Sequence, residues 1–189
     1  MSIPWTNPLP GREDACRRTG SRTSTDMRYD EGPTAEATVI IDAPVARVRQ
    51  LVTDINLPAQ FSDEFRGAQW IDDGPAMGAR FVGRNWHKAM GEWETVSIVN
   101  LFDPMRAFGW SVTDVDEPSS TWSFELDQQS DGVHLCQRAR MGPAPSGLSI
   151  AITAMPEKEE RIVARRLEEF EANMRATLQG IKHLAEQAP

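Results

Sequence analysis

Hydrophobic and polar residues begin to alternate regularly at residue 34. Between residues 34 and 41 almost every second side chain is apolar, which predicts a β-strand. Residues 45–52 change to the three- and four-residue spacing of an amphipathic helix, with Pro44 suited to its first turn. A second, shorter helical turn is expected over residues 58–62. The chain therefore starts its folded part with a strand followed by two short helices.

Residues 65–141 contain six further short segments with the composition of strands. They are separated by turns that carry Gly, Pro or Asp. The expected strands cover residues 65–71, 79–87, 92–101, 106–113, 121–126 and 133–141. Because their connections are short, successive strands are expected to pair in an antiparallel meander.

One long amphipathic helix is predicted over residues 156–187. Its apolar side chains form a single continuous stripe along one face. These residues are Val163, Leu167, Phe170, Met174, Leu178, Ile181 and Leu184. A stripe of this length has to be buried, and the meander is the only partner large enough to bury it.

Composition and charge favour one globular domain and exclude several function classes. The 189 residues are 40 % hydrophobic and carry a net charge of −8, which argues against a nucleic-acid surface. No apolar run is long enough for a membrane span, so stable membrane insertion is not expected. With two cysteines and no recognisable secretory signal, we expect a cytoplasmic protein. Residues 1–26 lack a sustained apolar period and are expected to be a disordered extension, with Met27 as an alternative start and residues 27–189 as the domain.

The order of these elements, together with three local motifs, resembles a known superfamily. The motifs are Val-Ile-Ile-Asp-Ala-Pro at residues 39–44, Trp-Glu-Thr at residues 93–95 and Pro-Met-Arg-Ala-Phe-Gly-Trp at residues 104–110. Over residues 34–187 the chain resembles the START-like, birch-pollen-allergen-like (SRPBCC) superfamily, in its polyketide cyclase/dehydrase-like branch. The resemblance implies an α+β helix-grip fold, in which a curved antiparallel sheet of about seven strands wraps around the long helix and encloses a hydrophobic cavity. It leaves the function open, because this superfamily includes lipid and steroid carriers, hormone receptors and aromatase/cyclases.

The alternation along each strand predicts which side chains face such a cavity. The expected ligand-binding residues are Phe81, Asn85, Phe108, Trp110, Trp122, Phe124, Leu135, Gln137, Phe170 and Met174. Gln137 stands out because it is a polar side chain on an otherwise apolar inner face. A buried amide without a partner is costly, so it needs a polar neighbour, water or a ligand.

Catalytic chemistry has one candidate residue. His87 could act as a general acid or base near neutral pH, although a half-solvated histidine at a strand end is the simpler interpretation. Glu92 and Glu94, across the same hairpin, are expected to be solvated edge carboxylates, with orientation of His87 by one of them as the alternative. The histidines and cysteines lack the spacing of metal ligands, and no nucleophile or cofactor motif is present, so neither a metal nor a cofactor is expected. Cys136 is predicted on the outer face of the sheet as a structural thiol.

Three functions remain open on this evidence. The first is binding of a small hydrophobic, aromatic or polyketide-like molecule in the cavity. The second is a cyclase or dehydratase that uses His87, and the third is an interaction module whose outer sheet face serves as a homodimer or partner surface.

Residues 142–155, which precede the long helix, contain apolar residues at near-alternate spacing and are expected to form a mobile flap over the cavity entrance. The alternative is an edge strand or a helical turn that covers core.

Overall fold

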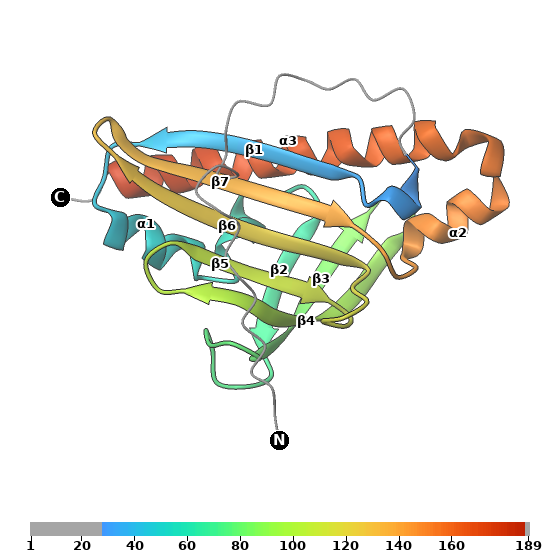
Figure 1. The fold of residues 1–189 in the computed structure, drawn as a ribbon, viewed down its shortest axis with the longest axis horizontal. Helices are drawn as coiled ribbons and strands as arrows, with labels where there is room; N and C mark the ends of the chain where they lie inside the picture. Colours follow the sequence, from blue (N-terminus) through green and yellow to red (C-terminus); the bar gives the residue numbers. More distant parts are fainter. Residues whose placement is uncertain (1–27, 188–189) are drawn as a thin grey trace.

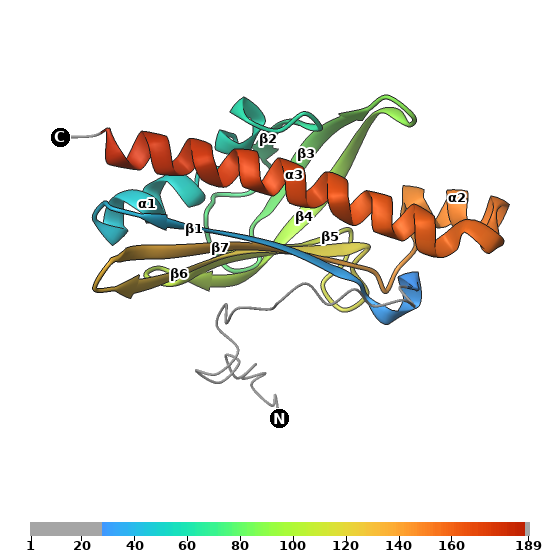
Figure 2. The same cartoon turned by 90° about the horizontal axis from the view of Figure 1, so that it is seen from above.

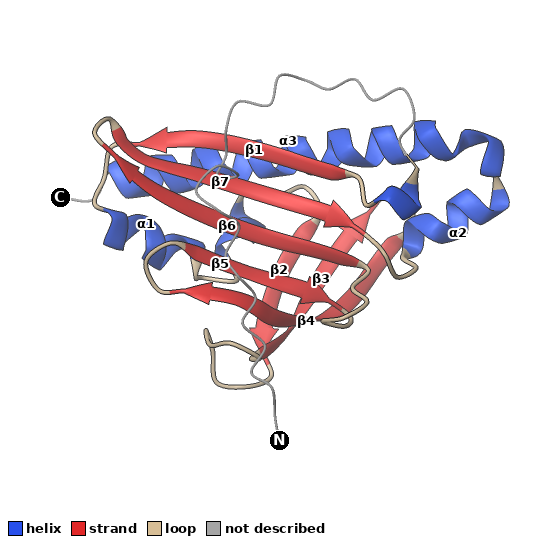
Figure 3. Ribbon diagram, in the orientation of Figure 1, coloured by secondary structure: helices blue, strands red, loops and turns tan. Residues whose placement is uncertain are grey.

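A single antiparallel sheet of seven strands forms the frame of the protein (Figures 1 and 3). The computed structural model describes residues 28–187. The strands are β1 (Thr34–Ile41), β2 (Phe65–Trp70), β3 (Arg80–His87), β4 (Gly91–Asp103), β5 (Ala107–Val112), β6 (Ser120–Gln129) and β7 (Gly132–Met141). Their order in the sheet is β1-β7-β6-β5-β4-β3-β2, so β2 to β7 form the expected meander and β1 closes it by pairing with β7.

The helices lie on one face of the sheet, with α3 in its concave side (Figure 2). They are α1 (Val45–Val52), α2 (Gly147–Ala154) and α3 (Glu159–Glu186), together with the short 3₁₀ turns η1 (Tyr29–Glu31), η2 (Leu57–Gln60) and η3 (Pro156–Lys158). Figure 2 shows the sheet curving around α3, with β1 and β7 along one side of the helix and β2 to β4 on the other. This is the expected helix-grip arrangement of an α+β fold.

The apolar stripe of α3 is buried as its spacing predicted. Val163, Met174, Leu178 and Ile181 are each at most 1 % exposed. Towards its C-terminal end the helix also lets η2 approach closely, because a side chain at Gly180 would overlap the ring of Phe61. Phe61 thereby packs against α3 shortly before the chain enters β2.

The segment before α3 is a helix, which agrees with the expected alternative of a helical turn and not with an edge strand; its role as a mobile flap stays a prediction. Ser146 and Ser149 form a reciprocal capping box that starts α2. Leu148 and Ile152, one helical turn apart, pack on the core, while Ile150 is 75 % exposed. No residue of α2 is fully buried, so this helix covers the core only partly.

Two further expectations concern the N-terminal segment and membrane insertion. The predicted disordered extension, residues 1–26, lies outside the described residues. Within residues 28–187, no helix is long and apolar enough to cross a bilayer.

Candidate functional site

A large cavity separates α3 from the concave face of the sheet. Its volume is about 1190 Å³. Ten of the predicted site residues line it: Phe81, Asn85, His87, Phe108, Trp110, Trp122, Phe124, Gln137, Phe170 and Met174. Leu135 does not; it is fully buried in the hydrophobic core outside the cavity. Alternation therefore predicted the correct face of each strand, but one residue on that face lies where the space is already filled.

Aromatic side chains form one wall of the cavity. Trp110 and Trp122 are cross-strand partners on β5 and β6, and their rings stack at 6.5 Å with an angle of 8° between planes. The ring of Phe170, from α3, meets Trp122 edge-on at 4.9 Å. The indole nitrogen of Trp122 donates to Ser120 Oγ at 3.1 Å. Because these rings pack against one another, they form an apolar surface whose side chains have little freedom to change rotamer. Such a surface suits a flat or aromatic molecule.

Gln137 lies on the inner face of β7 and is 5 % exposed. Its side-chain Oε1 is buried, and among the described residues it has no hydrogen-bond partner. Its neighbours in register are Phe124 and Ala37, neither of which has a polar side chain. An unpartnered buried acceptor costs about 1–3 kcal/mol, so this position favours a bound molecule that supplies a hydrogen bond.

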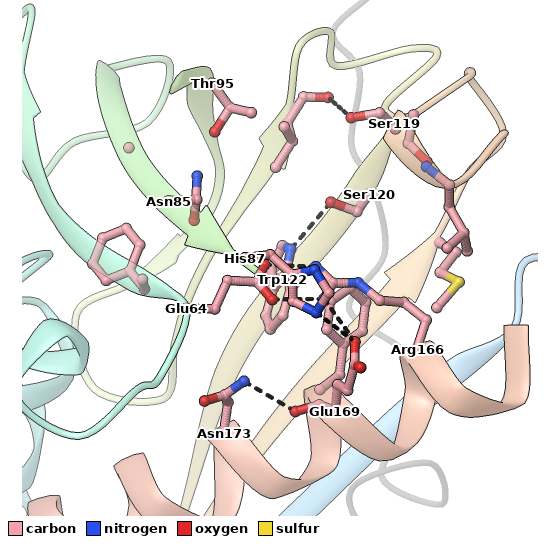
Figure 4. A pocket seen from close by; sticks show the side chains of 18 of the residues that line it. Glu64, Asn85, His87, Thr95, Ser119, Ser120, Trp122, Arg166, Glu169 and Asn173 are labelled. Carbon is pink, nitrogen blue, oxygen red and sulfur yellow. Dashed lines mark hydrogen bonds and ion pairs between the residues drawn. The ribbon is translucent and has the colours of Figure 1, made fainter. Parts of the chain in front are cut away.

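A charged cluster spans the gap between the sheet edge and α3. Both terminal nitrogens of Arg166 donate to Glu64, at 2.5 and 2.6 Å, and one of them also reaches Glu169 at 3.2 Å. The guanidinium lies over the ring of Phe170, 4.4 Å from its centre. Figure 4 shows Glu64, Arg166 and Glu169 converging beside the cavity, linked by dashed contacts. This charged cluster was not predicted from the sequence.

The electrostatics of the charged cluster keep Arg166 and Glu169 ionised. Burial of Arg166 works against its charge, but the bonds to Glu64 and Glu169 outweigh this and hold the pKa above its ordinary value. For Glu169, burial again opposes ionisation, while hydrogen bonds from Arg165 and Arg166 leave its pKa below the ordinary value. Glu169 is therefore a carboxylate at neutral pH.

His87 ends β3 with its ring in the cavity lining and its side chain 19 % exposed. Its Nδ1 accepts a hydrogen bond from the Ala89 backbone N–H at 3.2 Å, which places the proton of the neutral ring on Nε2. That Nε2 faces Glu169 Oε2 at 3.5 Å. Glu92 and Glu94 are exposed, in agreement with their interpretation as solvated edge carboxylates, and the carboxylate beside His87 comes from α3 instead of the hairpin.

Tyr29 is another lining residue that the sequence analysis missed. Its hydroxyl donates to the Ala144 carbonyl at 2.8 Å and lies 3.0 Å from Ser146 Oγ, so it ties the start of the domain to the N-terminus of α2. The available signal was that Tyr29 is the single tyrosine of the chain. Beside it, α2 and Met90 from the β3–β4 hairpin border the cavity.

No metal centre is evident in the part of the chain that the structure describes, since no three His, Cys, Asp or Glu side chains gather there in a way that could hold an ion. Cys136 lies on the outer face of the sheet, as alternation predicts, yet it is only 3 % exposed. Its neighbour Arg138 forms salt bridges to Glu36 at 2.8 Å and Glu125 at 3.5 Å on the same face.

Solved structures share this architecture. The Polyketide_cyc-like protein Cgl2372 from Corynebacterium glutamicum is 30 % identical, with a TM-score of 0.58 over 80 % of this chain and 90 % of that one. The di-domain ARO/CYC BexL from the BE-7585A biosynthetic pathway is 19 % identical, with a TM-score of 0.62; 83 % of this chain aligns with about half (51 %) of BexL. Ara h 8.0201 is 10 % identical, with a TM-score of 0.51 over 81 % of this chain and 97 % of that one. At 19 % and 10 % identity the last two show the fold alone.

No curated protein matches the chain. A family model does, over residues 33–186, which include all seven strands and the whole of α3. Because the match covers both walls of the cavity, the chain belongs to the polyketide cyclase / dehydrase and lipid transport family.

Proposed function

We propose that this protein binds a small, largely apolar and aromatic molecule in the cavity between the sheet and α3. The observation that carries the proposal is the combination of stacked Trp110 and Trp122 with the unpartnered Oε1 of Gln137 in the lining of one cavity. Apolar walls with a few fixed polar groups are typical of small-molecule sites. The aromatic wall supplies contact area, and the amide supplies orientation.

The size of the cavity and the family support this proposal. About 1190 Å³ is somewhat above the ~300–1,000 Å³ of most ligand pockets, so a molecule of several fused rings would fit. The family to which the chain belongs, polyketide cyclase / dehydrase and lipid transport, supports a polyketide-like molecule as the ligand. An interaction module that used only its outer face would have no need for an empty space of this size in its interior.

A second candidate function is a cyclase or dehydratase reaction, and the His87–Glu169 pair favours it. With Nδ1 occupied by the Ala89 N–H, the neutral ring carries a proton on Nε2, close to Glu169 Oε2 at 3.5 Å. In this form His87 would donate a hydrogen bond to a substrate carbonyl group, whereas transfer of a proton would need the imidazolium form of the ring. In this reaction the walls would fold the substrate, and much of the rate would come from positioning.

Binding can be tested with Nile red, an uncharged probe whose fluorescence rises in apolar surroundings. A matched pair of variants on β3 distinguishes the cavity from the outer surface: Asn85→Trp places a large ring in the cavity, whereas Arg84→Trp places the same ring on the exposed outer face. We expect Asn85→Trp to weaken Nile red binding by about tenfold or more, and Arg84→Trp to leave it unchanged. Native mass spectrometry of the purified protein tests for a bound apolar molecule directly.

Two results would contradict the proposal. One is a wild-type protein of normal thermal stability that Nile red never enters. The other is equal binding of the probe by both tryptophan variants, because the probe would then occupy some other surface.

A further inference from the structure

The charged residues that border the cavity are not arranged symmetrically. The described lining contains three acids and three bases, but Asp54, Lys88 and Arg165 lie in exposed positions. The ionised groups that face the interior are the two carboxylates of Glu64 and Glu169 and the single guanidinium of Arg166. Arg165, although exposed, also donates to Glu169, at 3.3 Å, so both guanidinium groups at this wall are already paired with carboxylates.

Arg166 is poorly placed to receive an anion from the cavity. Both of its terminal nitrogens already donate to Glu64, and one also reaches Glu169. One face of the guanidinium is covered by Phe170. A carboxylate entering the cavity would have to displace one of these partners, and it would meet two like charges in a region of low dielectric constant, where repulsion is stronger than in water.

Gln137 gives an independent indication of the same preference. Its buried Oε1 needs a hydrogen-bond donor, which a hydroxyl or an amide supplies and an ionised carboxylate does not. The Oε1 of Gln137 thus favours a ligand that carries a hydrogen-bond donor, and the charged cluster favours a ligand without a carboxylate.

We infer that the cavity selects uncharged ligands over carboxylates of the same shape, and that Glu64 and Glu169 are the residues that determine this specificity. The inference rests on the proposed binding function and adds to it the chemical class of the ligand. It excludes free carboxylic acids, such as fatty acids, with the head group in the interior.

Naphthamide and naphthoate form a matched probe pair, because they differ in charge but hardly in shape. At about pH 7.5 the carboxylic acid is ionised and the amide is neutral. By isothermal titration calorimetry we expect naphthamide to bind at least about tenfold more tightly than naphthoate. Glu64→Gln removes one carboxylate and frees a donor of Arg166, so this variant should reduce the preference at least about threefold, mainly by improved naphthoate binding.

Two control variants make the result interpretable. Glu157→Gln removes the same charge from an exposed position outside the cavity lining, where the side chain is 68 % exposed, and should leave the preference unchanged. Glu169→Gln repeats the test at the other carboxylate, in case Glu64→Gln lowers the melting temperature strongly. A smaller preference in either interior variant, with no change in Glu157→Gln, supports the inference.

Three outcomes overturn it. Equal or tighter binding of naphthoate by the wild-type protein contradicts the selectivity itself. A preference that persists unchanged in both Glu64→Gln and Glu169→Gln would mean that desolvation of the carboxylate alone causes it, not the charged cluster. Failure of both naphthyl probes and of Nile red to bind overturns the proposed binding function and this inference with it, whereas Nile red binding with reversed naphthyl selectivity overturns only the inference.

Discussion

Replacement of Gln137 by leucine should make the protein more stable and its ligand binding less selective. In the empty protein the buried Oε1 has no partner among the described residues, which costs about 1–3 kcal/mol. Leucine has one non-hydrogen atom fewer than glutamine, and the lost contact offsets about 0.8 kcal/mol of that gain. The expected net stabilisation of Gln137→Leu is therefore about 1 kcal/mol.

This stabilisation can be measured by urea unfolding and by thermal melting. For a chain of this size, about 1 kcal/mol corresponds to a rise of roughly 2–4 °C in the melting temperature. Gln129→Leu is the matched control, because Gln129 is exposed at the end of β6 and its amide donates to Asp127 at 2.8 Å. That substitution removes no buried unpartnered group and should bring no gain in stability.

Ligand binding provides the second measurement on Gln137→Leu. Naphthol carries a hydroxyl donor and naphthalene does not, so the wild-type protein should prefer naphthol and the variant should lose about two- to tenfold of that preference. A loss of more than about 1 kcal/mol in stability would refute the reasoning, because Gln137 would then belong to a structural hydrogen-bond network.

Four further expectations concern other parts of the molecule. If the protein is an enzyme, His87→Ala should abolish turnover in a steady-state assay while ligand affinity stays within about threefold; unchanged turnover would exclude His87 as the acid. Because the pKa of Glu169 is lowered by folding, this carboxylate stabilises the protein above its ordinary pKa of 4.5, and the stability is lost as the pH falls through the lower pKa of the folded state. Glu169→Gln should therefore reduce the fall in melting temperature at acid pH, and an unchanged fall would contradict this. Amide hydrogen exchange in α2 should be fast in the empty protein and slower with ligand bound; equal, strong protection in both states would rule out a flap. Deletion of residues 1–26 should leave the melting temperature and Nile red binding unchanged, which calorimetry and the probe assay can check; a marked drop would show that the segment docks on the domain.

Much of the fold could be predicted from local periodicity. The alternation in β1 and the helical stripe of α3 are short-range patterns, and both elements form where these patterns lie. The same alternation correctly placed Trp110, Trp122 and Gln137 on the inner face, because successive residues of a strand point to opposite sides whatever surrounds them. The segment that forms α2 could not be assigned in this way, because a short apolar run fits a strand or a helix, and only the Ser146 capping box distinguishes them.

The candidate site also has features that local backbone geometry determines and features that depend on the tertiary structure. The sequence by itself determined which side chains face inwards, since that depends on backbone geometry within each strand. Only the tertiary structure decided how much of the inner face borders empty space: Leu135 shares its face with Gln137 but lies in the filled part of the core. Likewise, Glu64 and Arg166 are 102 residues apart, and in the sequence both look like ordinary solvated charges. They meet because the sheet curves around α3, and a contact between distant segments leaves no periodic signal in either one.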